Sequence, residues 1–181
     1  EFIFQIPELL KTEKNPNPTA SMFPNGYLLM FGPEHAEQQY KALENHKACE
    51  AGTKNIKGSD LAKFFPYINK EGIETATFTD NKSEGWIDPF LFHTALKSKA
   101  IEQGAEFIKG EVKSLSEIKA KTIVSAAGCW TKELLEDIPV EPQKHTVFRV
   151  KCPKHIPEMP LTGDLTTGVY WRPEGKEYLA G

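Results

Sequence analysis

The most informative segment of this 181-residue chain is Lys121-Thr122-Ile123-Val124-Ser125-Ala126-Ala127-Gly128. It is an apolar run of β-branched and small residues that ends at a glycine. Runs of this kind are typical of strands in sheets that are covered on both faces. We therefore predict a buried strand over residues 121–128, followed by a short helix over 130–136.

The clearest helix signal precedes this strand. Asp88 suits the N-cap position and Pro89 the first helical position. One face of the expected helix, which ends at Gly104, carries Phe92, Ala95, Leu96 and Lys99. Beyond the helix, residues 107–108 and 112–115 are predicted to form short strand pieces.

The other elements follow from apolar runs bounded by turn residues. Helices are expected over 33–51 and 59–65, and strands over 26–31, 75–79, 144–151 and 168–172, with a last strand beginning at 178. In the first of these helices, Ala36, Tyr40 and Leu43 share one face. Residues 7–24 are rich in Lys, Asn and Pro, which indicates an exposed loop.

The composition excludes several classes of protein. Hydrophobic residues make up 39% and charged residues 26%, with a formal net charge of -3, so the chain is neither a collagen, a coiled-coil rod nor largely disordered. It has no long Lys/Arg cluster of the kind that binds nucleic acid. No apolar run approaches the roughly 20 residues of a transmembrane helix.

Familiar catalytic and metal motifs are absent from the sequence. There is no GxGxxG, P-loop, GxSxG or HExxH, and the five histidines show no metal-ligand spacing. The three cysteines form no disulfide framework, which favours reduced thiols in an intracellular protein. The first residues do not form a signal peptide, and both ends lead us to expect an internal part of a longer protein.

Six short motifs occur in a defined order along the chain. They are Gly85-Trp86-Ile87-Asp88-Pro89, Gly104-Ala105-Glu106-Phe107, Gly110-Glu111-Val112, residues 123–130 (IVSAAGCW), Pro139-Val140-Glu141-Pro142, and residues 164–173 with Gly168-Val169-Tyr170-Trp171-Arg172. This series resembles the D-amino-acid oxidase, glycine oxidase and sarcosine oxidase family of FAD-dependent oxidoreductases. The resemblance extends over nearly the whole chain from Asn25.

The resemblance implies an α/β (α+β) fold with two interleaved parts. One is a Rossmann-like FAD-binding domain, and the other is a substrate domain built on a mixed or antiparallel sheet. Residues 1–25 then form a loop and a partial leading element, 26–84 part of the substrate domain, 85–138 a partial FAD-binding domain, and 139–181 truncated substrate-domain strands.

The resemblance also implies the cofactor and the residues near it. FAD in the intact protein would contact Val112, Ala126, Ala127, Gly128 and Trp130. The alternatives are an ordinary strand valine, tight packing of small residues, and a core tryptophan. The glycine-rich turn that binds the FAD pyrophosphate is missing, as is the family's C-terminal glycine-rich segment, so we expect the chain purified alone to carry no flavin.

Tyr170 and Arg172 are the candidate catalytic residues. In the family this tyrosine would face the substrate cavity, and Arg172, two residues further along the strand, would share its face and pair with a carboxylate. The alternatives are a cross-strand aromatic for Tyr170 and a surface salt bridge for Arg172. His145 is interpreted as a solvated strand residue and Cys129 as a small buried filler.

The implied reaction moves a hydride from the carbon of a small amine or amino acid to the flavin. The motifs are most similar to a mitochondrial branch of the family, which implies a mitochondrial location, a role in complex I assembly and partners among respiratory-chain assembly proteins. The alternative function is a non-catalytic flavoprotein-fold scaffold. Neither nucleic acid nor metal is expected as a partner.

Overall fold

The computed structural model describes residues 2–79, 82 and 84–181. These residues divide into two compact units, unit 1 with Glu1–Gln103 and Val147–Gly181, and unit 2 with Gly104–Thr146. The predicted assignment of segments to substrate and FAD-binding domains follows other boundaries and stays a prediction.

Unit 1 is built on a mixed sheet. Its strands are β1 (Tyr27–Phe31), β2 (Thr53–Lys57), β3 (Thr75–Thr79), β4 (Phe148–Val150), β5 (Leu161–Asp164), β6 (Val169–Glu174) and β7 (Glu177–Ala180). Among the described residues, the seven strands lie in the order β2-β3-β1-β5-β6-β7-β4. β1 pairs with β5 in parallel and every other pair is antiparallel, so the expectation of a mixed α/β fold is confirmed.

The strands predicted at 26–31, 75–79 and 168–172 are confirmed as β1, β3 and β6. The strand expected over 144–151 is wrong in its length, because only Phe148–Val150 pairs with β7. β2 and β5 were not predicted from the sequence. β5 contains a glycine and ends at an aspartate, which are turn signals, but pairing with β1 and β6 holds it extended.

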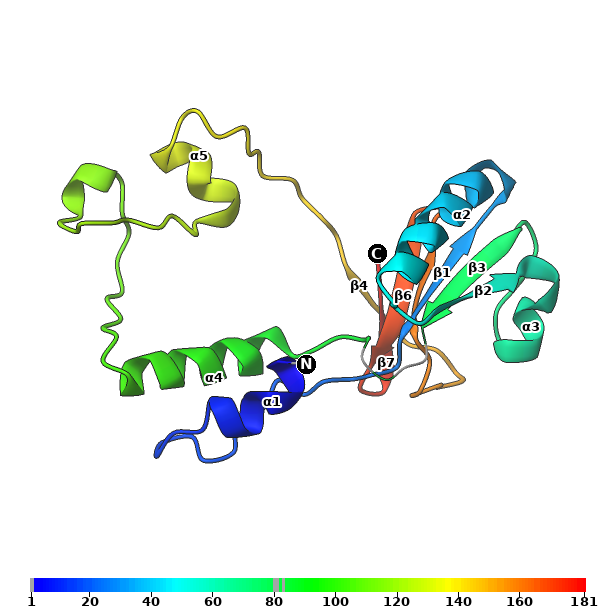
Figure 1. Ribbon diagram of the computed structural model, residues 1–181, viewed down its shortest axis with the longest axis horizontal. Helices are drawn as coiled ribbons and strands as arrows, with labels where there is room; N and C mark the ends of the chain where they lie inside the picture. Colours follow the sequence, from blue (N-terminus) through cyan, green and yellow to red (C-terminus); the bar gives the residue numbers. More distant parts are fainter. Residues whose placement is uncertain (1, 80–81, 83) are drawn as a thin grey trace. The chain divides into compact units, whose positions relative to one another are not determined.

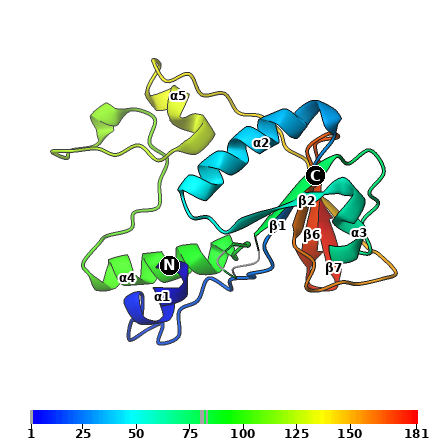
Figure 2. The same cartoon turned by 45° about the vertical axis from the view of Figure 1, so that its right-hand side comes forward.

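Helix α2 (Pro33–Ala48) packs on the sheet beside β1 and β2 (Figures 1 and 2). It begins at a proline, as predicted, and buries Ala36, Gln39 and Leu43. Tyr40, which we expected on the same face, is 46% exposed, so its place in that face is wrong. The reason is geometric, because buried positions at 36, 39 and 43 define a stripe that position 40 only borders.

Helices α1 (Phe2–Leu9) and α4 (Pro89–Glu102) lie side by side in both views (Figures 1 and 2). Ile6, Leu10, Ala20 and Ala95 form the small core between them. The cap predicted for α4 is confirmed, because the Asp88 carboxylate accepts hydrogen bonds from the first-turn amides of Phe90 and Leu91 at 2.9 and 3.0 Å. The predicted loop over 7–24 begins inside α1, which extends to Leu9.

The main core of unit 1 lies on one face of the sheet. It contains Leu28, Met30, Ile56, Leu61, Phe65, Ile68 and Ala76. The short helix predicted over 59–65 contributes to it as α3 (Leu61–Phe64), preceded by the 3₁₀ turn Gly58–Asp60.

Unit 2 has little regular structure. It contains the 3₁₀ turns Leu115–Glu117 and Gly128–Trp130 and the helix α5 (Thr131–Leu134), which confirms only the centre of the helix expected over 130–136.

The buried strand predicted over residues 121–128 is wrong, because these residues are irregular and Val124 is 85% exposed. The strand pieces predicted at 107–108 and 112–115 are wrong for the same reason. A strand needs a neighbour that satisfies its backbone amides and carbonyls. Within the described part of unit 2, no segment supplies one.

Candidate functional site

Unit 1 contains a cavity of about 650 Å³ on the face of the sheet that carries Leu28 and Met30. Five strands form its floor, and the loops over 67–73 and 152–159 form its walls. Its lining residues are Met30, Tyr67, Ile68, Asn69, Glu71, Ile73, Val150, Cys152, Lys154, Ile156, Met159, Asp164, Trp171, Tyr178 and Ala180. Its volume is typical of small-molecule sites, which run from about 300 to 1,000 Å³.

Strand register places the floor residues together. Met30 of β1 lies opposite Asp164 of β5, and Val150 of β4 lies opposite Tyr178 of β7. Trp171 of β6 lies opposite Ala180 of β7. Because paired residues project to the same face of a sheet, these side chains meet on the cavity side.

The loop over 152–159 is held in place by two polar side chains. The Tyr178 hydroxyl accepts a hydrogen bond from the amide of Ile156 at 2.7 Å and donates to the carbonyl of Lys154 at 3.3 Å. The Asn25 side-chain amide donates to the carbonyls of Pro157 and Met159 at 3.0 and 3.1 Å. The wall is therefore bonded to β7 through Tyr178 and to the segment before β1 through Asn25.

The lining of the cavity is mainly apolar and aromatic, with a few charged residues among it. Burial raises the pKa of the Tyr67 phenol to about 12, and the nearby Tyr178 adds to the shift, so Tyr67 stays neutral at physiological pH. The Asp164 carboxylate accepts hydrogen bonds from the Thr166 amide and the Thr167 hydroxyl in the β5–β6 turn. Both carboxylate oxygens therefore already have a partner. Glu71 and Lys154 are the exposed charges of the lining.

Tyr170 and Arg172 do share one face of β6, but they do not line this cavity. The Arg172 guanidinium lies 5.2 Å from the centre of the Trp86 ring and is paired with Glu174. Tyr170 is 38% exposed, and its backbone bonds to Gly181. The residue between them, Trp171, is the one that faces the cavity, and the catalytic roles of Tyr170 and Arg172 stay predictions.

The predicted cofactor residues all lie in unit 2 and are accessible. Val112 is 41% and Trp130 64% exposed, so neither is a core residue of this unit. Ala126 and Gly128 are exposed and Ala127 is half-buried. The structure brings Ala126, Ala127, Gly128 and Trp130 together, because the Trp130 amide bonds to the Ala127 carbonyl at 3.1 Å.

The segment around Gly128 fits a bound cofactor. Gly128 has φ +58, and no described atom lies within 4 Å of the position that a Cβ would occupy, so its backbone is open to a close approach. Three residues earlier, the Ser125 hydroxyl oxygen is buried and has no hydrogen-bond partner among the described residues. A cofactor bound to this segment could approach the Gly128 backbone closely and could supply the hydrogen-bond partner that the Ser125 hydroxyl lacks.

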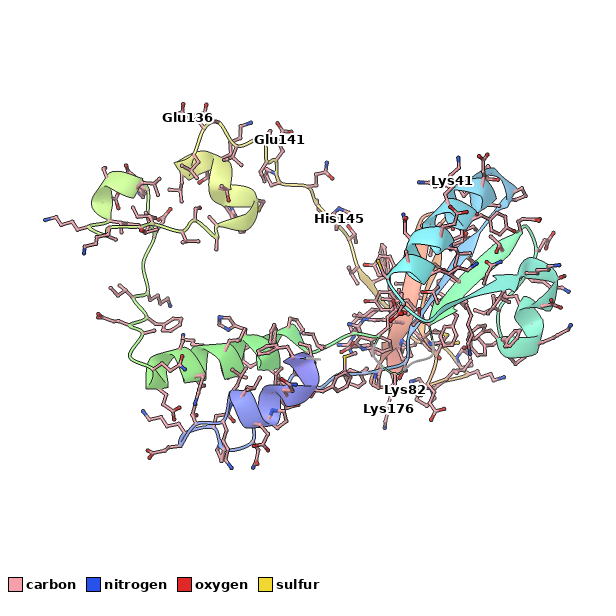
Figure 3. All side chains as sticks on the ribbon, viewed as in Figure 1. Lys41, Lys82, Glu136, Glu141, His145 and Lys176 are labelled. Atoms are coloured by element: carbon pink, nitrogen blue, oxygen red, sulfur yellow. The ribbon has the colours of Figure 1, made fainter. Side chains whose placement is uncertain are left out.

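His145 and Cys129, to which we assigned no functional role, also lie in unit 2. His145 is exposed (Figure 3), as expected of a solvated residue, although it lies outside any strand. Cys129 is half-buried rather than buried, and it lines a hollow of about 390 Å³ with Trp130. Cys49 and Cys152, like Cys129, are free cysteines.

The residues that the structure describes contain neither a membrane span nor a metal cluster. No helix among them is long and apolar enough to cross a bilayer. Nor does this part of the chain gather three His, Cys, Asp or Glu side chains that could hold a metal ion.

The chain belongs to the FAD dependent oxidoreductase (DAO) family, whose profile matches residues 6–181. Among curated proteins it is similar to FAD-dependent oxidoreductase domain-containing protein 1 of Bos taurus, with 27% identity over 97% of this chain and 46% of the relative. The Xenopus laevis protein of the same name is also 27% identical, over 87% of this chain and 42% of the relative. The chain thus spans about half the length of these relatives.

Solved structures show the same fold. The L-proline dehydrogenase from P. horikoshii aligns with a TM-score of 0.72 and 22% identity, over 89% of this chain and 49% of that chain. The glycine oxidase from Geobacillus kaustophilus aligns with a TM-score of 0.71 and 16% identity, over 99% of this chain and 51% of that chain.

Proposed function

We propose that the protein is an FAD-dependent oxidoreductase that oxidises the carbon–nitrogen bond of an amine or amino acid, with the unit 1 cavity as part of its substrate site. The proposal rests on family membership and, above all, on the aromatic cavity on the sheet. A cavity of this size and lining suits an organic ligand.

Bound FAD would supply the hydride acceptor for this reaction. The substrate carbon loses a hydrogen with both bonding electrons, the nitrogen lone pair forms the C=N bond, and the proton on nitrogen passes to water. Ala126, Ala127 and Gly128 would hold the cofactor through open backbone, with Val112 and Trp130 beside it. The Tyr67 hydroxyl stays protonated at physiological pH, so it can donate a hydrogen bond to the substrate without becoming a phenolate.

Tyr170 and Arg172 remain candidates for catalysis in this proposal. The proposal also includes a mitochondrial location and a role with complex I assembly proteins, which are supported by the order of the sequence motifs. The alternative is a non-catalytic scaffold, and the experiment described next distinguishes it from an enzyme.

The test uses protein expressed from the complete gene, loaded with FAD and kept free of oxygen. N-methyl and α-amino acids are added, and the flavin absorbance is recorded. Bleaching by one substrate class supports the oxidoreductase. Stoichiometric FAD with no bleaching by any amine would favour the scaffold.

A further inference from the structure

We propose that the open edge of β2 binds an extended peptide segment of a partner protein, in which apolar residues alternate with acidic ones. The segment adds a strand beside β2 and places an apolar side chain in the hollow that β2 and α3 border. This binding site is separate from the cavity described above, and the proposal does not depend on the oxidoreductase function.

The first observation is that β2 has a neighbour on only one side. Among the described strands it stands last in the sheet and pairs with β3 alone, and Figure 1 shows it with α3 at one end of the sheet. The amide of Gly58, directly after β2, donates to the Glu74 carbonyl at 2.9 Å. Because alternate residues of an antiparallel strand bond to its partner, the backbone groups that point away from β3 are those of Thr53, Asn55 and Lys57. An added strand can bond to these amides and carbonyls.

The second observation is a hollow of about 490 Å³ beside this edge, with an apolar part formed by Ile56, Phe64, Phe65 and Phe78. Phe65 is buried and packs edge-to-face against Phe78, with 5.2 Å between the ring centres, so these two rings belong to the folded core. Phe64 is 63% exposed. An apolar side chain of the added strand would cover the Phe64 ring and remove it from water.

The charges of the hollow favour an acidic partner. Lys54 and Lys57 both line it, and both are exposed. The acidic residue of the lining is Asp60, whose carboxylate is already bound by the Lys63 ammonium at 2.6 Å. A carboxylate on the added strand can therefore pair with a lysine of β2, while an apolar side chain on its other face enters the hollow.

A second copy of this chain matches the edge less well than an acidic segment does. Two β2 strands side by side would bring four lysines together, and like charges on neighbouring strands destabilise the pair. Lysines on an edge strand also hinder unwanted pairing with other chains. That role explains Lys54 and Lys57, but it does not explain the exposed Phe64 ring in a hollow beside them.

The experiment uses a fluorescein-labelled peptide of sequence Glu-Val-Glu-Phe-Glu-Val-Glu. It is titrated into the 181-residue chain and into the protein expressed from the complete gene, and its anisotropy is recorded. We expect saturable binding to both proteins, with an affinity that falls as the salt concentration rises. A control peptide with Lys in place of every Glu should bind at least about tenfold more weakly.

Two further measurements test whether the peptide binds as a strand. N-methylation of one alternating set of peptide amides should abolish binding and N-methylation of the other set should not, because only one set faces β2. Hydrogen exchange of the chain gives the second readout. In the complex, exchange should slow at the amides of Thr53, Asn55 and Lys57.

Two variants test the side-chain contacts. Lys57→Glu and Phe64→Ser should each weaken binding of the acidic peptide about tenfold, and both side chains are exposed, so the fold should persist. Lys176→Glu is the matched control for charge, because this exposed lysine of the β6–β7 turn (Figure 3) does not line the hollow. Phe90→Ser on α4, where the phenylalanine is 73% exposed, is the matched control for the aromatic ring. Neither control should change binding.

Several results would overturn the proposal. Absence of saturable binding, equal binding of the acidic and lysine peptides, or unchanged exchange of the three edge amides would leave the lysines with a protective role only. Binding to the 181-residue chain but not to the complete protein would show that another segment of the same protein covers the edge. Protection of the edge amides that rises with protein concentration in the absence of peptide would assign the edge to a second copy.

Discussion

Tyr178→Phe should destabilise unit 1 and loosen the loop that walls the cavity. The variant removes a hydroxyl that accepts from the Ile156 amide at 2.7 Å and donates to the Lys154 carbonyl at 3.3 Å. Tyr178 is 8% exposed and its bond to the Ile156 amide is part-buried, so water replaces the lost acceptor only in part. An amide left without a partner in such a place costs about 1–2 kcal/mol of unfolding free energy.

Urea unfolding of the chain, followed by tryptophan fluorescence, measures this loss as a lower midpoint with an unchanged slope. Hydrogen exchange gives the local readout, because the Ile156 amide should exchange faster in the variant. The phenyl ring remains, so the apolar packing of the cavity floor is preserved.

Tyr170→Phe is the matched control. It removes a phenolic hydroxyl from the neighbouring strand, at a side chain that is 38% exposed and whose hydroxyl has no hydrogen-bond partner among the described residues. It should change the unfolding free energy by less than about 0.5 kcal/mol. Equal effects of the two variants on the unfolding free energy, or an Ile156 amide that exchanges normally in Tyr178→Phe, would refute the claim that the Tyr178 hydroxyl holds the loop over 152–159 in place.

Three further predictions concern the fold of unit 1. Gly58→Ala should cost about 3 kcal/mol in urea unfolding, because a Cβ there would lie 1.8 Å from the Ile73 carbonyl oxygen, and normal stability would contradict that close approach. Asp88→Ala should cost about 1 kcal/mol and speed exchange of the first-turn amides of α4, whereas Asp88→Asn should retain most of the cap. Ultraviolet titration should find Tyr67 ionising with a pKa of about 12, and Tyr67→Phe should remove that step. Because the folded pKa of Tyr67 is raised, its contribution to stability is complete below the unfolded pKa of about 10 and is lost as the pH rises towards 12.

The sequence predicted those elements that are determined by residues within or next to them. α4 begins where Asp88 and Pro89 place it, since a cap depends on the residues that immediately follow it. β1 follows from a short apolar run between turn residues. β5 was missed, because Gly163 and Asp164 are turn residues and only the neighbouring strands keep them extended.

The segment over 121–128 shows the opposite case. Its composition suits a buried strand, yet the described chain leaves it irregular and Val124 exposed. Strand propensity describes how a side chain fits a half-buried surface, and it supplies no hydrogen-bond partner. Because Ala126 and Gly128 are exposed, a cofactor could reach the backbone of this segment.

The sequence did not indicate which face of β6 carries the cavity that we propose as the substrate site. Tyr170 and Trp171 are adjacent aromatics on β6, so alternation puts them on opposite faces without indicating which face carries a cavity. That face is determined by long-range pairing: Trp171 lies opposite Thr162, which is fully buried, and Thr162 in turn lies opposite Leu28 in the core. A register shift of one residue would exchange the two aromatic side chains. The cavity side of β6 is therefore a property of the assembled sheet, and the pairing of β5 is the observation on which the assignment of Trp171 depends.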